Sequence, residues 1–356
     1  MHRMFDACRR WVSHSSLAVL ASLLGACASP PETPPASPRQ APGQAAVIRT
    51  DNSLKPGILG RSDRLIVYQP RAGETLKSIA AQLLGSEDQD WKIAEANGIS
   101  QPQPGQPLIV PLKALYPTGV HADRYQTVPI LCYHRFGGSA GKMSVSPDNF
   151  AIQLDWLARN GYHVIRLSQL TGFLQGRETL PQRSVVITID DGYESTYRYA
   201  WPALRKHNFP ATLFVYTDFV GAGDAVSWTQ LQELAKSGLI DIQSHSKTHR
   251  NLIERSAGED DTRYRQSIEN ETRIPRELLE KRLNVQVEQY AYPYGDANDI
   301  VLDALNRHQY KLAVTVTPGG NAFFAQPLML RRTMIFGDHD LEAFKAKLQI
   351  SRPVLP

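Results

Sequence analysis

The chain has 356 residues, of which 42% are hydrophobic and 21% are charged. These proportions are typical of folded domains and exclude a wholly disordered chain. The formal net charge is +4, and no block of Lys or Arg stands out, so charge gives no support to nucleic-acid binding. The length suits one large domain with a small one, or two of medium size. The cysteines, Cys8, Cys27 and Cys132, form neither a disulfide framework nor a CxxC metal motif.

The N-terminus has the features of an export signal. Basic residues precede an apolar stretch at 17–24, which is too short to span a bilayer. The stretch ends in Leu-Gly-Ala-Cys27, which resembles the lipobox of bacterial lipoproteins. The resemblance implies a signal peptide at 1–26 and an acylated Cys27 that anchors the protein to a membrane of the cell envelope. Ala and Ser follow Cys27 in place of Asp, and by resemblance to Gram-negative sorting rules this favours the outer membrane, facing the periplasm. The alternatives are an ordinary signal with a chance cysteine, or a buried helix.

A proline-rich segment follows, and we assign 27–63 as a tether. Proline at this density blocks helix and sheet and favours an extended polyproline II conformation. Such a spacer would hold the folded part of the protein away from a membrane.

Residues 64–113 form a candidate small domain. An apolar strand at 65–68 precedes an amphipathic helix within 72–84, a second helix at 90–97 and a closing strand within 104–111. This βααβ order resembles the LysM domain, as do Ala-Gly-Glu-Thr-Leu-x-x-Ile-Ala, Asn97 and Pro-Gly-Gln-x-Leu-x-Val-Pro. The resemblance implies binding to N-acetylglucosamine chains, usually peptidoglycan. A small structural domain without ligand affinity is the alternative.

Residues 128–348 alternate short apolar runs with helical stretches. The predicted strands are 128–133, 184–189, 211–216, 240–243, 287–292 and 312–316, and the predicted helices are 149–159, 196–206, 229–236, 263–282 and 299–307. This alternation predicts an α/β fold with a parallel sheet or barrel. Because catalytic groups of such folds gather at the carboxyl ends of strands, residues just after the apolar runs are candidates for chemistry.

Two of these strand ends carry residues of the types that bind metal ions. Asp190 and Asp191 follow the strand 184–189, and neighbours in an extended stretch point to opposite sides. One carboxylate can therefore hold a metal while the other addresses a water, although Asp-Asp-Gly is also an ordinary turn. His245 and His249 are four residues apart, a spacing that we expect to place them on one side of a helical turn. An Asp with two His supplies three ligands and leaves a position open for water.

Two further strand ends carry polar or turn-forming residues. The run Tyr-Ala-Tyr-Pro293-Tyr294-Gly leads from a strand into a turn whose backbone N–H groups can face a ligand. His134 ends the first strand of this unit and can act as an acid or base near neutral pH. The alternatives are a plain aromatic turn and a structural histidine. Cys132 lies in the same apolar strand and is expected to be a buried thiol.

Taken together, these motifs resemble those of the NodB-homology polysaccharide deacetylases, carbohydrate esterase family four. The resemblance implies an irregular (β/α) barrel in which Asp190 is the catalytic base. It also implies that Asp191, His245 and His249 bind a divalent metal, most often Zn²⁺, with Co²⁺ or Ni²⁺ as alternatives. The Pro293–Tyr294 turn would contact the substrate, and the backbone N–H of Tyr294 would stabilise the oxyanion.

The sequence departs from the family pattern in two places. Ala291 stands where most members have the Arg that orients the base, and Arg331 or Arg332, expected on a late strand, is a candidate replacement. The usual C-terminal Leu-x-Leu-His is absent. The Tyr-His-Arg-Phe run containing His134 instead resembles the circularly permuted branch, which includes deacetylases of exported poly-N-acetylglucosamine. His134 is therefore the expected acid, with His339 as the alternative.

The sequence thus predicts a monomeric hydrolase that removes N-acetyl groups from an N-acetylglucosamine-containing glycan. Peptidoglycan and an exopolysaccharide both remain open as substrates. The alternative functions are an O-acetyl polysaccharide esterase and a non-catalytic lipoprotein that binds peptidoglycan.

Overall fold

The computed structural model describes residues 56–114, 117–137 and 141–353. The predicted signal at 1–26, the lipid-anchor candidate Cys27 and the proline-rich part of the tether lie outside these residues, so the expectations placed on them stay predictions. Within the described ranges, no helix combines the length and apolar character needed to cross a membrane.

Three short antiparallel strands and two helices form a small unit. The strands are β1 (Ile58–Arg61), β2 (Leu65–Tyr68) and β3 (Leu108–Pro111), in the order β1-β2-β3. The helices are α1 (Leu76–Leu84) and α2 (Asp90–Asn97). Strand β1 lies within 27–63, the segment that we assigned to the tether. It belongs to the small unit instead, because it pairs with β2. The small unit therefore begins before residue 64.

Sequence signals explain where these helices begin and end. Thr75 caps α1 by a reciprocal capping box with Ser78, and Gly85 ends the helix with a positive φ of 84°. The side chain of Asn97 donates to the carbonyl of Ile93 and exchanges two hydrogen bonds with the backbone of Ile109. This asparagine thereby joins α2 to β3, which gives it a structural role in the unit.

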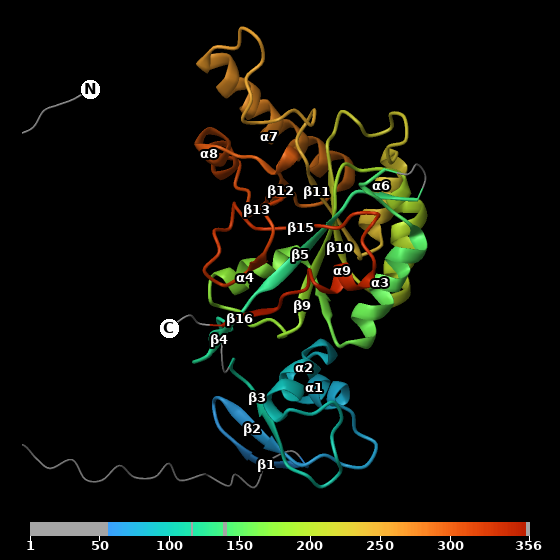
Figure 1. Cartoon of the computed structure of the whole chain (residues 1–356). Coiled ribbons are helices and arrows are strands. Elements are labelled where there is room, and N and C mark those ends of the chain that lie inside the picture. The colour runs from blue at the N-terminus through green and yellow to red at the C-terminus, as the bar shows by residue number, and fades with distance from the viewer. Residues whose placement is uncertain (1–55, 115–116, 138–140, 354–356) are drawn as a thin grey trace, which may run out of the picture. The chain divides into compact units, whose positions relative to one another are not determined.

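The large unit is built on a nine-stranded sheet, shown in Figure 1. The main path runs β13-β12-β11-β10-β9-β5-β14, with β8 paired to β9 and β15 paired to β5. All pairings are parallel except that of β14 with β5. The strands are β5 (Val128–Tyr133), β8 (His163–Ile165), β9 (Ser184–Ile189), β10 (Ala211–Val215), β11 (Ile240–Ser244), β12 (Gln289–Ala291), β13 (Leu312–Val314), β14 (Gly320–Asn321) and β15 (Thr333–Met334).

A short segment links the two ends of the parallel sheet. Leu330 forms a parallel bridge with Val314 of β13, and Thr333 pairs with Leu131 of β5. The segment 330–334 therefore reaches from the last strand of the sheet to the first, so the sheet curls into the expected irregular (β/α) barrel. Arg332 lies in the middle of this closing segment.

Helices lie between the strands, as the alternation predicted. They are α3 (Pro147–Arg159), α4 (Leu170–Leu174), α5 (Trp201–His207), α6 (Trp228–Lys236), α7 (Asp261–Leu283), α8 (Asp299–Arg307) and α9 (Leu341–Lys345), and a π-helical turn at Thr196–Ala200 leads into α5. Short two-stranded pairs join β4 (Arg124–Gln126) to β16 (Ser351–Pro353) and β6 (Arg135–Phe136) to β7 (Ser144–Val145).

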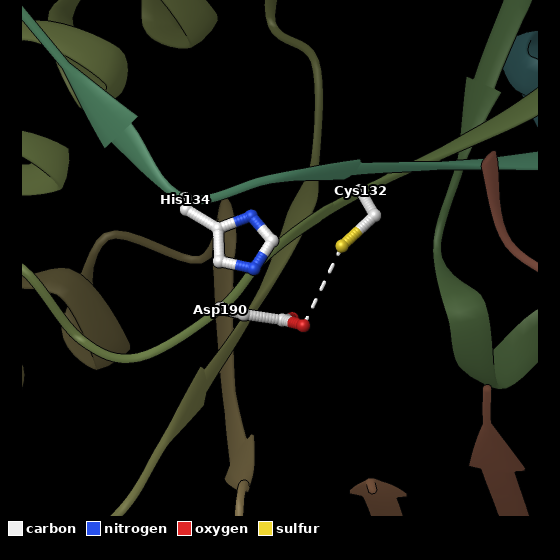
Figure 2. A group of neighbouring side chains, drawn as sticks. All are labelled: Cys132, His134 and Asp190. Atoms are coloured by element: carbon white, nitrogen blue, oxygen red, sulfur yellow. Dashed lines mark hydrogen bonds between the residues drawn. The ribbon is translucent and has the colours of Figure 1, made fainter. Parts of the chain in front are cut away.

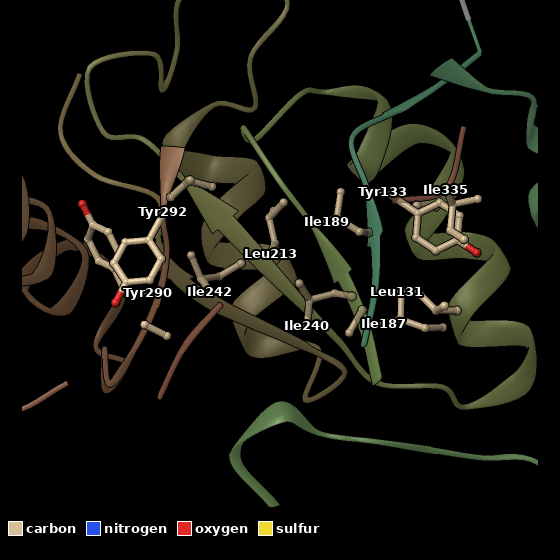
Figure 3. Packing of buried hydrophobic residues seen from close by; sticks show 14 of the residues in the cluster. Leu131, Tyr133, Ile187, Ile189, Leu213, Ile240, Ile242, Tyr290, Tyr292 and Ile335 are labelled. Carbon is tan, nitrogen blue, oxygen red and sulfur yellow. The ribbon is translucent and has the colours of Figure 1, made fainter. Parts of the chain in front are cut away.

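The two faces of the sheet bury different clusters because side chains alternate along a strand. Leu131, Tyr133 and Ile187 belong to the larger cluster, part of which Figure 3 shows, and this cluster packs against the helices. Ile130 and Val186, one residue away on the same strands, belong to a second cluster on the other face. Polar residues of this second face lie near the carboxyl ends of β5 and β9, where the candidate site is found.

Candidate active site

Asp190 follows β9 and is held by three donors. It is 1% exposed, and the guanidinium of Arg332 donates to both of its carboxylate oxygens at 2.7 Å. The thiol of Cys132 donates to Oδ2 at 3.4 Å. Arg332 is itself fully buried and also donates to Thr315 O and Thr188 Oγ1. A bidentate, fully desolvated ion pair fixes both the position and the rotation of the carboxylate.

These neighbours determine the charge states of the buried groups. Burial by itself would raise the pKa of Asp190, but Arg332 and then His245 outweigh it, and the pKa lies below its usual value. Burial raises the pKa of Cys132 well above that of a free thiol, although Arg332 opposes the shift. Asp190 is therefore a carboxylate at neutral pH, and Cys132 is a neutral thiol that can donate to it.

Asp191, His245 and His249 converge on one point. Oδ1 of Asp191 lies 3.4 Å from Nε2 of His245 and 3.2 Å from Nε2 of His249. Nδ1 of His245 lies 2.8 Å from the carbonyl of Ala291, which is an acceptor, so this nitrogen carries a proton and Nε2 is the ring atom that faces Asp191. Oδ1 of Asp191 is buried and has no hydrogen-bond partner.

Three potential ligand atoms that lie this close together could hold a shared cation. Two imidazole nitrogens and a carboxylate oxygen form the ligand set of open zinc-type sites. The three residues therefore fit the divalent metal that the sequence implied. The carbonyl of Ala291 fixes the tautomer and ring orientation of His245, as partners of metal-bound histidines commonly do.

Two expectations about local geometry were wrong. His245 and His249 do not lie on a helical turn, because the chain after β11 is a loop in which Ser246 and His249 have positive φ angles of 80° and 65°. Asp190 and Asp191 do not point to opposite sides, since β9 ends at Ile189 and Asp191 has a φ of 74°. Both carboxylates instead lie within 4.0 Å of Nε2 of His245.

A buried glutamate on α7 anchors the histidine loop. Glu271 is 4% exposed, and its Oε2 accepts the backbone N–H groups of Lys247 and Thr248 at 2.9 Å each. Its Oε1 accepts the hydroxyl of Thr248 at 2.7 Å. The carboxylate thus fixes the segment between His245 and His249. Sequence reasoning missed Glu271, and its only signal was a charged residue among the apolar positions of the helix.

His134 lies beside Asp190, as Figure 2 shows. The nearest ligand atoms of Cys132, His134 and Asp190 all lie within 4.8 Å of one another, and Nδ1 of His134 is buried without a hydrogen-bond partner. Burial lowers the pKa of His134, and Asp190 and Asp191 oppose part of this shift. A lowered pKa makes the imidazolium a stronger acid, but it reduces the protonated fraction near neutral pH.

The other candidates identified from sequence lie elsewhere. Nδ1 of His339 accepts a hydrogen bond from the backbone of Phe336, and the two rings pack together. Arg331 is exposed and donates to the carbonyl of Pro318. The structure therefore places His134 and Arg332 beside Asp190. Side-chain alternation could have indicated Cys132, because it lies two residues before His134 and so on the same face of β5.

The third motif forms the expected turn. A 3-10 turn, Pro293–Gly295, follows β12, with Pro293 buried and φ angles of 60° at Tyr294 and 84° at Gly295. A Cβ at Gly295 would lie 2.7 Å from the backbone nitrogen of Val316, so only glycine fits. The ring of Tyr294 is 61% exposed and lies 5.1 Å from that of His249.

Comparison with known proteins defines the class of this domain. Residues 177–313 match the polysaccharide deacetylase family. The poly-β-1,6-N-acetyl-D-glucosamine N-deacetylase of Escherichia coli K12 is 27% identical in an alignment of 241 residues that covers 58% of this chain but only 36% of that protein. The protein of the same name from Staphylococcus aureus MRSA252 is 27% identical over 197 residues, 52% of this chain and 68% of that one.

Solved structures agree with this assignment. The Streptococcus pyogenes deacetylase PplD, in complex with acetate, is 27% identical with a TM-score of 0.57, over 63% of this chain and 98% of that one. IcaB from Ammonifex degensii is 28% identical with a TM-score of 0.57, over 63% of this chain and 97% of that one. The large unit therefore matches the polysaccharide deacetylases, a class of hydrolases, over residues 177–313, and it is similar in fold to solved members of that class.

Proposed function

We propose that the protein is a metal-dependent N-deacetylase of an N-acetylglucosamine polymer, with poly-β-1,6-N-acetylglucosamine as its substrate. The observation that carries the proposal is the arrangement at the end of β9. There a carboxylate fixed by Arg332 lies directly beside a three-ligand cluster with an unpaired oxygen. The names of relatives from two organisms support the choice of polymer over peptidoglycan.

In this proposal each residue of the site has a distinct role. Asp190 takes a proton from the attacking water, since Arg332 keeps its carboxylate ionised and correctly oriented. A divalent cation held by Asp191, His245 and His249 would supply Lewis acidity and a water of lowered pKa. The backbone N–H of Tyr294 donates to the oxygen on which negative charge develops as the carbonyl is attacked.

His134 completes the reaction by giving a proton to the departing nitrogen. The C–N bond of the acetamide then breaks, and the products are acetate and a free amine on the sugar. Proton donation is needed because an amide anion is too poor a leaving group. The unpartnered ring nitrogen of His134 and its closeness to Asp190 support this role.

Acetate release from two polymers, measured side by side, tests the proposal. We expect purified protein to release acetate from poly-β-1,6-N-acetylglucosamine and much less from peptidoglycan, and Asp190→Asn to abolish release from both. Equal or greater release from peptidoglycan would overturn the choice of polymer. A preference for an O-acetylated polysaccharide would replace amide hydrolysis with ester hydrolysis.

We also propose that the small unit binds N-acetylglucosamine chains as a LysM domain. Its order of strands and helices supports this, and such a unit would raise the local concentration of the enzyme on its polymer. A variant that begins near residue 127 should keep turnover on short oligomers but lose pull-down by the insoluble polymer. Unchanged pull-down would count against a binding role.

Attachment to the outer membrane through an acylated Cys27 remains part of the proposal. It is supported by the lipobox-like sequence alone. The Cys27→Ala variant should appear in the soluble periplasmic fraction, while the parent protein stays with the membrane. An identical distribution of the two proteins would refute the anchor.

A further inference from the structure

Arg331 of the closing segment has no role in the active site, and its surroundings indicate a second site. Neighbouring residues in extended backbone project to opposite sides, so Arg332 enters the barrel while Arg331 faces solvent. The side chain of Asn321 fixes this position, because it accepts the N–H of Arg331 and donates to the carbonyl of the same residue. Arg331 is thus held in place on the outer surface of the barrel.

A second guanidinium lies beside that of Arg331. Arg352 pairs with Tyr125 across the β4–β16 ladder. A Cβ placed on Gly319, whose φ is 140°, would lie 3.1 Å from Cδ of Arg331 and 3.8 Å from Nη2 of Arg352. Both arginine side chains therefore occupy the space directly above this glycine, which needs to lack a side chain.

These two cations have no counter-ion among the residues that the structure describes. Neither guanidinium is within 4.0 Å of a described carboxylate, whereas many other arginines of the chain form ion pairs. Nε of Arg352 is buried and has no hydrogen-bond acceptor. Two nearby positive charges and an unpaired buried donor are unfavourable by themselves, and a bound oxyanion would relieve both.

Both arginines line a hollow of about 370 Å³, and aromatic side chains also line it. Phe324 is 64% exposed there, and its ring lies 5.4 Å from that of Tyr125. Gln326 adds an amide group to the lining. Aromatic rings take up the apolar face of a sugar, while amides and guanidinium groups bind its polar substituents.

The hollow lies away from the catalytic residues. Strand β14 pairs with Val128 and Pro129 at the start of β5, whereas His134 follows the end of that strand. At about 3.3 Å per residue, roughly 20 Å separate the two ends. A ligand in the hollow therefore does not reach Asp190 as part of the same sugar unit.

We propose that this hollow is a second, non-catalytic binding site for an anionic saccharide, a sugar ring that carries a carboxylate or a phosphate. The oxyanion binds between Arg331 and Arg352, and the ring packs on Phe324. The site would let the protein hold an acidic glycan independently of deacetylation.

Calorimetric titration of the full chain tests this inference. The probes are glucuronic acid, glucose 6-phosphate, glucose and inorganic phosphate. We expect the two charged sugars to bind and glucose not to bind, and the tighter of the two identifies the anion. Arg331→Gln and Arg352→Gln should each weaken this binding roughly tenfold or more. Arg273→Gln is the control, since Arg273 is an exposed arginine paired with Glu277 on α7.

A second variant tests the sugar component of the site. Phe324→Ala should weaken binding of the charged sugars but leave binding of inorganic phosphate unchanged. Thermal unfolding and acetate release should match those of the parent in every variant. Charged-sugar binding that survives both arginine substitutions would overturn the site. Inorganic phosphate that binds as tightly as glucose 6-phosphate, regardless of Phe324, would overturn the saccharide assignment.

Discussion

Asp190 and Asp191 are adjacent in sequence, yet their surroundings divide the active site into two halves. In the closed half, Asp190 has a bidentate arginine and a thiol as donors, and its charge is balanced within the barrel. In the open half, Oδ1 of Asp191 faces Nε2 of two histidines and is buried without a hydrogen-bond partner. In the closed half the charges are balanced by the chain alone, whereas the open half is arranged as a cluster that could hold a cation.

Substitutions in the two halves should therefore affect different properties, the stability of the fold in the closed half and the activity in the open half. Changes in the closed half leave a buried charge unpaired and should therefore destabilise the fold. Changes in the open half remove a ligand from a site that the protein does not complete by itself, so they should reduce activity while the fold persists. Four substitutions test the division.

The largest effect is expected from His249→Ala in the open half. Loss of a ligand should reduce metal content and lower kcat by roughly 10³-fold, since the metal supplies several kcal/mol of transition-state stabilisation. Chelation of the parent protein should have the same effect, and added Zn²⁺ or Co²⁺ should reverse it. His207→Ala, on α5 beside Asp155, is the control. Full activity of a metal-free His249→Ala protein would contradict the ligand assignment.

Arg332→Met should have the largest effect on stability. It leaves Asp190 buried without its counter-ion, at a cost of about 3–5 kcal/mol in the free energy of unfolding. Denaturant titration measures this loss, and adding Asp190→Asn to the same protein should recover part of it. A loss below 1 kcal/mol, a value typical of an exposed pair, would mean that Arg332 does not stabilise the closed half.

The pH dependence of stability should also reverse in this variant. In the parent, the folded-state pKa of Asp190 is lowered, so its stabilising contribution is present above the unfolded pKa of about 3.9 and is lost as pH falls through the folded pKa. Without Arg332, burial should raise the folded pKa above about 3.9. The variant should then gain stability as the solution is acidified from neutral pH towards pH 4.

Glu271→Gln tests the support of the open half. The amide keeps the size of the side chain but replaces one acceptor with a donor, which then faces backbone N–H groups. We expect metal affinity to fall roughly tenfold, as for other groups that orient ligands indirectly. Competition with a chromogenic chelator measures the affinity. Glu277→Gln, on the exposed surface of α7, should bind metal as the parent does.

The smallest effect is expected from Cys132→Ala. It removes one neutral donor from Asp190, and such a bond contributes about 0.5–1.5 kcal/mol. Because Arg332 still holds both oxygens, kcat should fall by less than roughly tenfold. Cys132→Ser keeps a donor and should be closer to the parent. A loss from Cys132→Ala as large as that from His249→Ala would mean that the thiol acts in the open half instead.

The sequence predicted the architecture of the large unit through its long apolar runs. β5 and β9 were predicted at their observed bounds, because six buried residues in succession are a strong signal. β8 was missed, since it has three residues and is recognisable only by its pairing with β9. Arg331 and Arg332 were predicted to lie on a late strand, but the role of that strand in closing the barrel was not predicted, because its bridges to β13 and β5 join residues far apart in the chain.

The candidate site was predictable in its residues but not in its geometry. The motifs identified Asp190, Asp191, His245 and His249, and the structure brings all four together. The choice between Arg331 and Arg332 depended on which side of the closing segment faces the barrel. Sequence alone did not show which of the two side chains faces the barrel, because the pairing partners of this late strand were not predicted.

The same site limits how stable this protein can be. Seven described residues other than glycine have positive φ angles, and four of them, Asp191, Ser246, His249 and Tyr294, lie in the catalytic motifs. Each such conformation costs about 1–3 kcal/mol, while a whole domain is commonly stable by only about 5–15 kcal/mol. Selection for heat resistance and selection for turnover would therefore act in opposite directions at these four positions. A descendant that lost the reaction would be free to replace them and to become more thermostable.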